Sequence, residues 1–155
     1  MLTSGYDSAL KIIYDHLNKK DILWALTGST SFIIQGMQLI PHDIDIQTDE
    51  AGAYAINELL KVYEMKPVTF SSTDKIRSHI GYFEINDISV EVMGDIQKKY
   101  NNAWEDIVDL HPIIELIIYK DMILPVLNLF YESIAYKKMG RFERASEIDS
   151  FLGKC

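Results

Sequence analysis

Two aspartates separated by one residue mark the segment 42–46, which reads HDIDI. In a β-strand the residues i and i+2 share a face, so Asp43 and Asp45 would lie side by side, with Ile44 and Ile46 facing the other way. Parallel carboxylates repel each other, and aspartate is depleted in strands. A divalent cation such as Mg²⁺ between the two acids would explain the pattern. The alternative is a solvated strand face that carries two acids.

A third acid, Glu91, follows the same local pattern. It stands between Val90 and Val92, so alternation in a strand places both valines on one face and the carboxylate on the other. Beside the aspartate strand, Glu91 would complete a cluster of three carboxylates. Such a cluster can hold two cations about 4 Å apart, which is the geometry of two-metal phosphoryl transfer. The alternative is an exposed glutamate on a hairpin.

The pair Gly28-Ser29 stands between an apolar segment, 22–27, and a segment with helical spacing, 30–37. Glycine lets the backbone turn sharply and lets a ligand approach closely. The serine hydroxyl and the free N–H groups at the start of a helix favour an anion such as phosphate. A turn glycine followed by a helix-capping serine is the structural alternative.

The elements that must position these residues follow from apolar periodicity and from turn residues. Helices are predicted over 6–17, 30–37, 48–63, 128–139 and 142–152, with Ser4, Thr48 and Asn128 as caps. Strands are predicted over 22–27, 43–47, 68–70, 77–85, 88–93, 113–119 and 122–126. Asn86-Asp87 and Lys120-Asp121 are the expected hairpin turns, and the first would place Tyr82 across from Glu91. This mixed order predicts an α/β (α+β) fold, a twisted mixed β-sheet with helices packed on it.

The combined pattern resembles the nucleotidyltransferase superfamily, the polymerase-beta-like group. It consists of Gly28-Ser29, 13 intervening residues (30–42), the Asp43-x-Asp45 motif and a later strand acid. The stretch 26–36, LTGSTSFIIQG, is similar to small bacterial members, including lincosamide and aminoglycoside nucleotidyltransferases and AbiEii-type toxins. It looks closest to small stand-alone members of the group. The resemblance covers residues 22–93 and is vaguer toward the C-terminal helices.

The resemblance implies that a nucleoside monophosphate moves from a nucleoside triphosphate (NTP) to an acceptor hydroxyl, with release of pyrophosphate. Asp43, Asp45 and Glu91 would be the catalytic and metal-binding residues for Mg²⁺ or Mn²⁺, with Glu91 on the acceptor side. Gly28 and Ser29 would grip the triphosphate. Partners would be the NTP and a small-molecule or protein acceptor.

The chain departs from the family pattern in its cations. Many members carry Arg or Lys after the Gly-Ser pair or before the Asp-x-Asp motif, whereas residues 30–42 contain neither. Related members also carry an Arg-x-Lys-Asp run near the C-terminus, of which only Arg141 remains. Lys137 and Arg141 are therefore the candidate nucleotide-binding cations, and solvated surface charges are the alternative. These departures leave open a nucleotide- or metal-binding module without turnover, or a toxin–antitoxin component acting through a protein partner.

Length and composition limit the remaining possibilities. The chain has 155 residues, 48% hydrophobic and 25% charged, so a single domain over 1–155 is expected. A net charge of -8 disfavours an extended nucleic-acid partner, although the end of a tRNA stays possible as an acceptor. The single cysteine is Cys155, which excludes an intrachain disulfide and favours a reducing, cytoplasmic location. No apolar stretch approaches the ~20 residues of a membrane span, and residues 1–14 do not resemble a signal peptide.

Overall fold

The computed structural model describes residues 2–153, so Cys155 lies outside the described residues. The helices are α1 (Ser4–Leu17), α2 (Gly28–Ile34), α3 (Glu50–Leu59), α4 (Leu129–Lys138) and α5 (Phe142–Phe151), with short 3-10 helices at Lys61–Tyr63 and His111–Ile113. The strands are β1 (Trp24–Thr27), β2 (Ile44–Thr48), β3 (Glu64–Ser72), β4 (Ile76–Ile85), β5 (Ile88–Tyr100), β6 (Ala103–Trp104), β7 (Ile114–Tyr119) and β8 (Met122–Leu127).

The strands form one mixed sheet in the order β3-β4-β5-β2-β1-β8-β7, and β6 pairs with the end of β5. Strand β2 runs parallel to β5 and antiparallel to β1, and β1 runs parallel to β8. The predicted fold class, a twisted mixed sheet with packed helices, is confirmed. The parallel pairing of β2 with β5 is the feature that matters for function, because it joins the two strands that carry the predicted acids.

Both predicted hairpins are present. Asn86 and Asp87 have φ values of 53° and 63° between β4 and β5, and Lys120 has a φ of 54° between β7 and β8. These left-handed conformations suit a two-residue turn, and asparagine and aspartate tolerate them better than most residues do. The first hairpin pairs Tyr82 with Glu91, as the sequence predicts.

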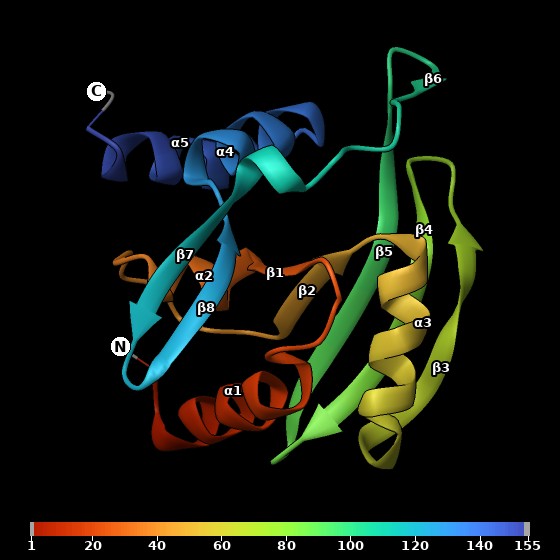
Figure 1. Cartoon of the computed structure of the whole chain (residues 1–155). Coiled ribbons are helices and arrows are strands. Elements are labelled where there is room, and N and C mark those ends of the chain that lie inside the picture. Colours follow the sequence, from red (N-terminus) through yellow and green to blue (C-terminus); the bar gives the residue numbers. More distant parts are fainter. Residues whose placement is uncertain (1, 154–155) are drawn as a thin grey trace.

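The helices cover the sheet unequally (Figure 1). Helices α1 and α3 lie together on one face, in front of the sheet in this view, and their apolar side chains join the main core. Helices α4 and α5 pack against each other near one end of the sheet, where they form a second cluster with α2 through Phe32, Tyr136 and Ile148. No helix among residues 2–153 has the length and apolar character that crossing a membrane requires.

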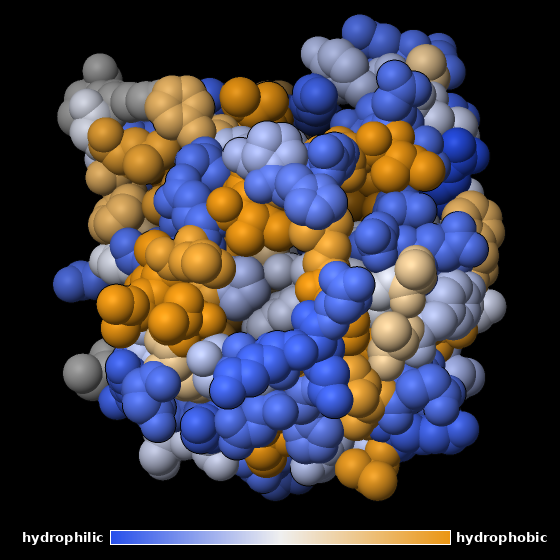
Figure 2. Space-filling model, viewed as in Figure 1, coloured by the Kyte–Doolittle hydropathy of each residue, from blue (hydrophilic) through white to orange (hydrophobic). Residues whose placement is uncertain are grey.

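Apolar residues also gather on the surface of the β7–β8 hairpin (Figure 2), where Leu116, Ile118 and Ile123 are exposed. Strand β7 is the last strand in the sheet order, so this hairpin forms one edge of the sheet.

Several predicted boundaries are wrong. Thr3, not Ser4, precedes α1, and Asp49, not Thr48, caps α3 by accepting a hydrogen bond from the Gly52 amide at 2.7 Å. Thr48 cannot cap α3 because it is the last residue of β2, where its hydroxyl donates to the Leu23 carbonyl. Strand β3 is much longer than 68–70, since an exposed edge strand does not need the apolar alternation by which strands are recognised. Strand β5 likewise continues beyond Met93, to Tyr100.

Candidate active site

The predicted acids meet in one row across the sheet. The residue pairs are Thr27 with Asp45 between β1 and β2, Asp45 with Glu91 between β2 and β5, and Glu91 with Tyr82 between β5 and β4. Asp43 lies just before β2. Each of the three carboxylates offers one oxygen, and these oxygens lie within 4.8 Å of one another. The structure therefore brings together the three acids that the sequence singled out.

Packing on the opposite face fixes the direction of these side chains. Ile44, Ile46, Val90 and Val92 are fully buried in the core beneath α1 and α3. Because side chains alternate along a strand, the burial of these four residues turns Asp45 and Glu91 toward the face that α1 and α3 leave uncovered. The apolar residues thus decide where the acids point.

The electrostatics of the cluster favour a bound cation. Burial, together with the neighbouring charge of Glu91, raises the pKa of Asp45 to about 8, and burial also raises the pKa of Glu91. The Asp45 Oδ1 atom is buried and has no hydrogen-bond partner among residues 2–153. Carboxylate oxygens are the ligands that Mg²⁺ and Mn²⁺ prefer. An oxygen without a donor inside a carboxylate cluster fits a divalent cation, which would satisfy it and offset the repulsion.

Gly28 lies against the cluster. Its φ is +74°, and a Cβ atom at this position would come within 2.4 Å of Asp45 Oδ2. Only glycine combines this backbone conformation with such a close approach.

Ser29 and Thr30 hold the segment that leads into the aspartate strand. The Ser29 hydroxyl accepts a hydrogen bond from the His42 amide at 2.9 Å, and the Thr30 hydroxyl donates to the Asp43 carbonyl at 3.1 Å. The start of α2 therefore positions the Asp-x-Asp motif directly. Ser29 has this structural role whether or not it also contacts a phosphate.

Comparison with known proteins identifies the family. The family model of aminoglycoside-2''-adenylyltransferase matches residues 9–150. The chain belongs to this adenylyltransferase family. The resemblance to nucleotidyltransferases expected from the sequence is thereby confirmed.

Solved structures agree with the assignment. TM1012 from Thermotoga maritima, a candidate nucleotidyltransferase, is 44% identical, with a TM-score of 0.88, over 100% of this chain and 97% of that one. ANT(2'')-Ia in complex with adenylyl-2''-tobramycin shares 10% identity and a TM-score of 0.62 over 96% of this chain and 90% of that one. The lincosamide antibiotic adenylyltransferase LnuA, lincomycin-bound, shares 13% identity and a TM-score of 0.56 over 95% and 98%. The last two support the fold alone. No curated protein matches the chain.

The chain also has a buried acid near the site that was not predicted from its sequence. Glu132 on α4 is 1% exposed and accepts hydrogen bonds from the Thr27 hydroxyl at 2.5 Å and the Gly28 amide at 3.4 Å. Burial raises the pKa of Glu132 to about 7. A signal was available, because Glu132 falls in helical register with Leu129 and Tyr136, which are buried.

The two predicted cations of this adenylyltransferase-family chain differ in position. Arg141 lines a cavity together with Gly28 and Asp45, and its guanidinium lies 4.6 Å from the centre of the Tyr136 ring. Lys137 is not among the residues that line this cavity, and its Nζ atom lies 2.9 Å from Asp149. The structure therefore places Arg141, but not Lys137, in the wall of the cavity beside Asp45.

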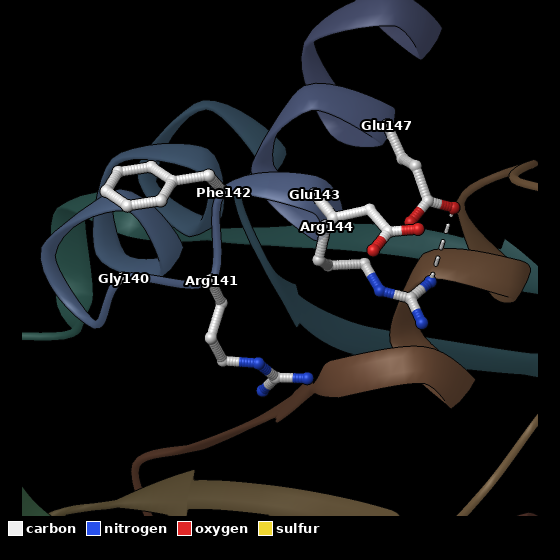
Figure 3. Close-up of a pocket in the computed structure, with 6 residues that line it drawn as sticks. All are labelled: Gly140, Arg141, Phe142, Glu143, Arg144 and Glu147. Carbon is white, nitrogen blue, oxygen red and sulfur yellow. Dashed lines mark ion pairs between the residues drawn. The ribbon is translucent and has the colours of Figure 1, made fainter.

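A further arginine stands near Arg141. Figure 3 shows that Arg141 and Arg144 both extend from the start of α5 toward the ribbon of α2. The Arg144 Nη1 atom lies 3.8 Å from the Glu147 carboxylate, and within the described part of the chain this buried atom has no hydrogen bond. Arg144 follows Arg141 by three positions, but it is not among the residues that line the cavity beside Asp45.

Proposed function

We propose that the protein is a metal-dependent nucleotidyltransferase that moves a nucleoside monophosphate from an NTP to a hydroxyl group of a small molecule. The observation that carries the proposal is the cluster of Asp43, Asp45 and Glu91, whose oxygens lie within 4.8 Å of one another beside Gly28. Two relatives of similar fold bind antibiotic compounds, adenylyl-2''-tobramycin in one and lincomycin in the other. Their ligands favour a small molecule as the acceptor.

Each residue of the site has a role in this proposal. Asp43, Asp45 and Glu91 would hold Mg²⁺ or Mn²⁺, which supplies charge neutralisation at the phosphates and makes the acceptor hydroxyl more acidic. Gly28 leaves room for the triphosphate beside Asp45, and Arg141 provides a positive charge next to it. Ser29 keeps the Asp43 segment in place.

One bond forms and one breaks at the α-phosphorus in the proposed reaction. The acceptor oxygen forms a bond to the α-phosphorus, and its proton passes to the Glu91 carboxylate. The bond between the α-phosphorus and the bridging oxygen breaks, and pyrophosphate leaves. Tyr82, opposite Glu91, lines a hollow of about 300 Å³ with Asp43 and Glu91, and we place the acceptor there.

The test is pyrophosphate release from ATP with Mg²⁺ and a panel of hydroxyl-bearing acceptors, beginning with aminoglycosides and lincosamides. Asp45→Asn should lower the rate by about 10³-fold or more, because the loss of a cation ligand removes several kcal/mol of charge stabilisation. Asp74→Asn, an exposed aspartate in the turn before β4, is the matched control and should keep the wild-type rate. Equal rates in the two variants would overturn the site.

A binding module without turnover is the second candidate. It is favoured by the position of Lys137 away from the site and by the lack of Lys or Arg in residues 30–42. Calorimetry separates the two candidates. Mg²⁺-dependent ATP binding that Asp45→Asn abolishes, with no pyrophosphate released to any acceptor in the panel, would favour the module over the enzyme.

A further inference from the structure

A cavity of about 180 Å³ opens beside Asp45, between the sheet and α4. Two carboxylates, Asp45 and Glu132, line it together with Thr27 and Gly28. The apolar part of the wall comes from β4, β5, α4 and the residue that follows α4, and it consists of Ile76, Met93, Ile96, Ala135, Tyr136 and Met139. A pocket that takes a whole ligand usually measures roughly 300–1,000 Å³. This cavity is therefore suited to one flat apolar part of a larger ligand.

Gln47 lies in the wall of this cavity and lacks a partner. It is 6% exposed, and its Oε1 atom is buried without any hydrogen bond among residues 2–153. It follows Asp45 by two positions on β2, so both side chains lie on the same side of the sheet. An unsatisfied buried acceptor is costly. A ligand that donates a hydrogen bond inside the cavity would remove that cost.

Among residues 2–153, neither cation that shares the cavity donates a hydrogen bond to the Gln47 oxygen. The Lys98 Nζ atom lies 3.2 Å from Glu105 Oε2, and Lys98 is 5% exposed. The guanidinium of Arg141 lies over the Tyr136 ring. The Gln47 oxygen is therefore open to a donor from outside the protein.

We propose that Gln47 recognises the adenine base of the donor nucleotide, an inference that rests on the proposed transfer function. A glutamine amide offers one acceptor and one donor in a plane, and this pair matches the 6-amino group of adenine and the ring nitrogen beside it. The apolar wall suits the faces of a purine. The cavity also adjoins Asp45 and Gly28, where the phosphates and cations are placed, so one nucleotide can reach both regions.

The experiment compares ATP with purine riboside triphosphate, which lacks only the 6-amino group. Binding of each to the full chain is measured by calorimetry with Mg²⁺ and no acceptor. We expect the wild-type protein to bind ATP about tenfold more tightly or better, because a site built to accept a hydrogen bond discriminates strongly against a ligand without the donor. In Gln47→Met this ratio should fall below about twofold. Gln38→Met makes the same change at an exposed glutamine and should keep the wild-type ratio.

The outcomes separate the two proposals. Equal affinity of the wild-type protein for both nucleotides would mean that the 6-amino group makes no favourable contact, and it would overturn base recognition by Gln47 while leaving the transfer function intact. A discrimination that persists in Gln47→Met would also overturn the inference. Absence of Mg²⁺-dependent binding of either nucleotide would overturn both proposals. If Gln47→Met does not fold, equal binding of the two nucleotides by the wild-type protein still overturns the inference.

Discussion

The two faces of strands β2 and β5 differ sharply although their residues alternate along the same backbone. On the face under α1 and α3, Ile44, Ile46, Val90 and Val92 are 0% exposed and pack in the main core. The other face carries two carboxylates whose pKa values are raised, Asp45 and Glu91. It also carries buried oxygens, on Asp45 and Gln47, for which the described residues provide no donor. One face therefore stabilises the fold, while the other holds unfavourable groups that a ligand would satisfy.

Ile46→Ala should produce the largest effect on stability. Truncating a fully buried isoleucine removes apolar contacts and leaves a cavity, which costs about 3 kcal/mol of unfolding free energy. Urea unfolding at pH 7 measures this loss, and one transition is expected because we propose that residues 1–155 form a single domain. A cost below about 1 kcal/mol would contradict the view that this face supplies the stability.

In the metal-free protein, the face that carries the carboxylates should lower the unfolding free energy as the pH rises. Burial, with the charge of Glu91, raises the pKa of Asp45 from 3.8 to about 8, so between these values the native state binds more protons than the unfolded state. The contribution of Asp45 to the unfolding free energy is then fully present below about pH 4 and is lost as the pH rises toward 8.

We expect the metal-free protein to lose about 2 kcal/mol between pH 5 and about pH 6.5, measured by urea unfolding with a chelator present. Asp45→Asn should lose much less, because the amide does not ionise. Asp74→Asn should follow the wild type. A metal-free wild-type protein that gains stability over this range would disprove the repulsion on the polar face.

The sequence predicted which face of each strand is apolar, but it did not predict which strands are neighbours in the sheet. Alternation around Ile44 and Val90 assigned the apolar and acidic sides of both strands, and Asn86-Asp87 located the hairpin. No local pattern indicated that β2 pairs in parallel with β5, because that pairing depends on how the intervening segment, 49–87, folds back. The family resemblance could therefore suggest that the acids meet, whereas the strand patterns alone leave their relative positions open.

Two details of the site were missed for a different reason. Glu132 was overlooked because glutamate in a helix normally faces water, and its burial depends on the contact of α4 with Thr27. The missing partner of Gln47 depends on the cavity beneath α4, which only tertiary structure creates.

Gly28→Ala tests how tightly the polar face is packed. Alanine at φ +74° is strained, and its Cβ would also collide with Asp45 Oδ2, so we expect a loss of about 2 kcal/mol. Gly140 is the matched control, because its φ is +76° but a Cβ there meets nothing within 4 Å. Gly140→Ala should cost about 1 kcal/mol from the backbone alone. Equal losses would show that Asp45 moves aside freely, and the two glycines would then not distinguish the site from an ordinary turn.

Added Mg²⁺ or Mn²⁺ should give the smallest shift, and it tests the comparison most directly. A cation that binds only the folded state stabilises it by about 1.4 kcal/mol at ten times its dissociation constant, which corresponds to a rise of roughly 3–6 °C in melting temperature. The rise should disappear in Asp45→Asn, which lacks a ligand, and should persist in Ile46→Ala, which is less stable but keeps all three acids. Because Asp45 and Ile46 are adjacent, a cation effect that depends on the first and not on the second can come only from the face that carries the carboxylates. A wild-type melt that responds to neither ion at millimolar concentration would remove the reason for treating the two faces as different in function.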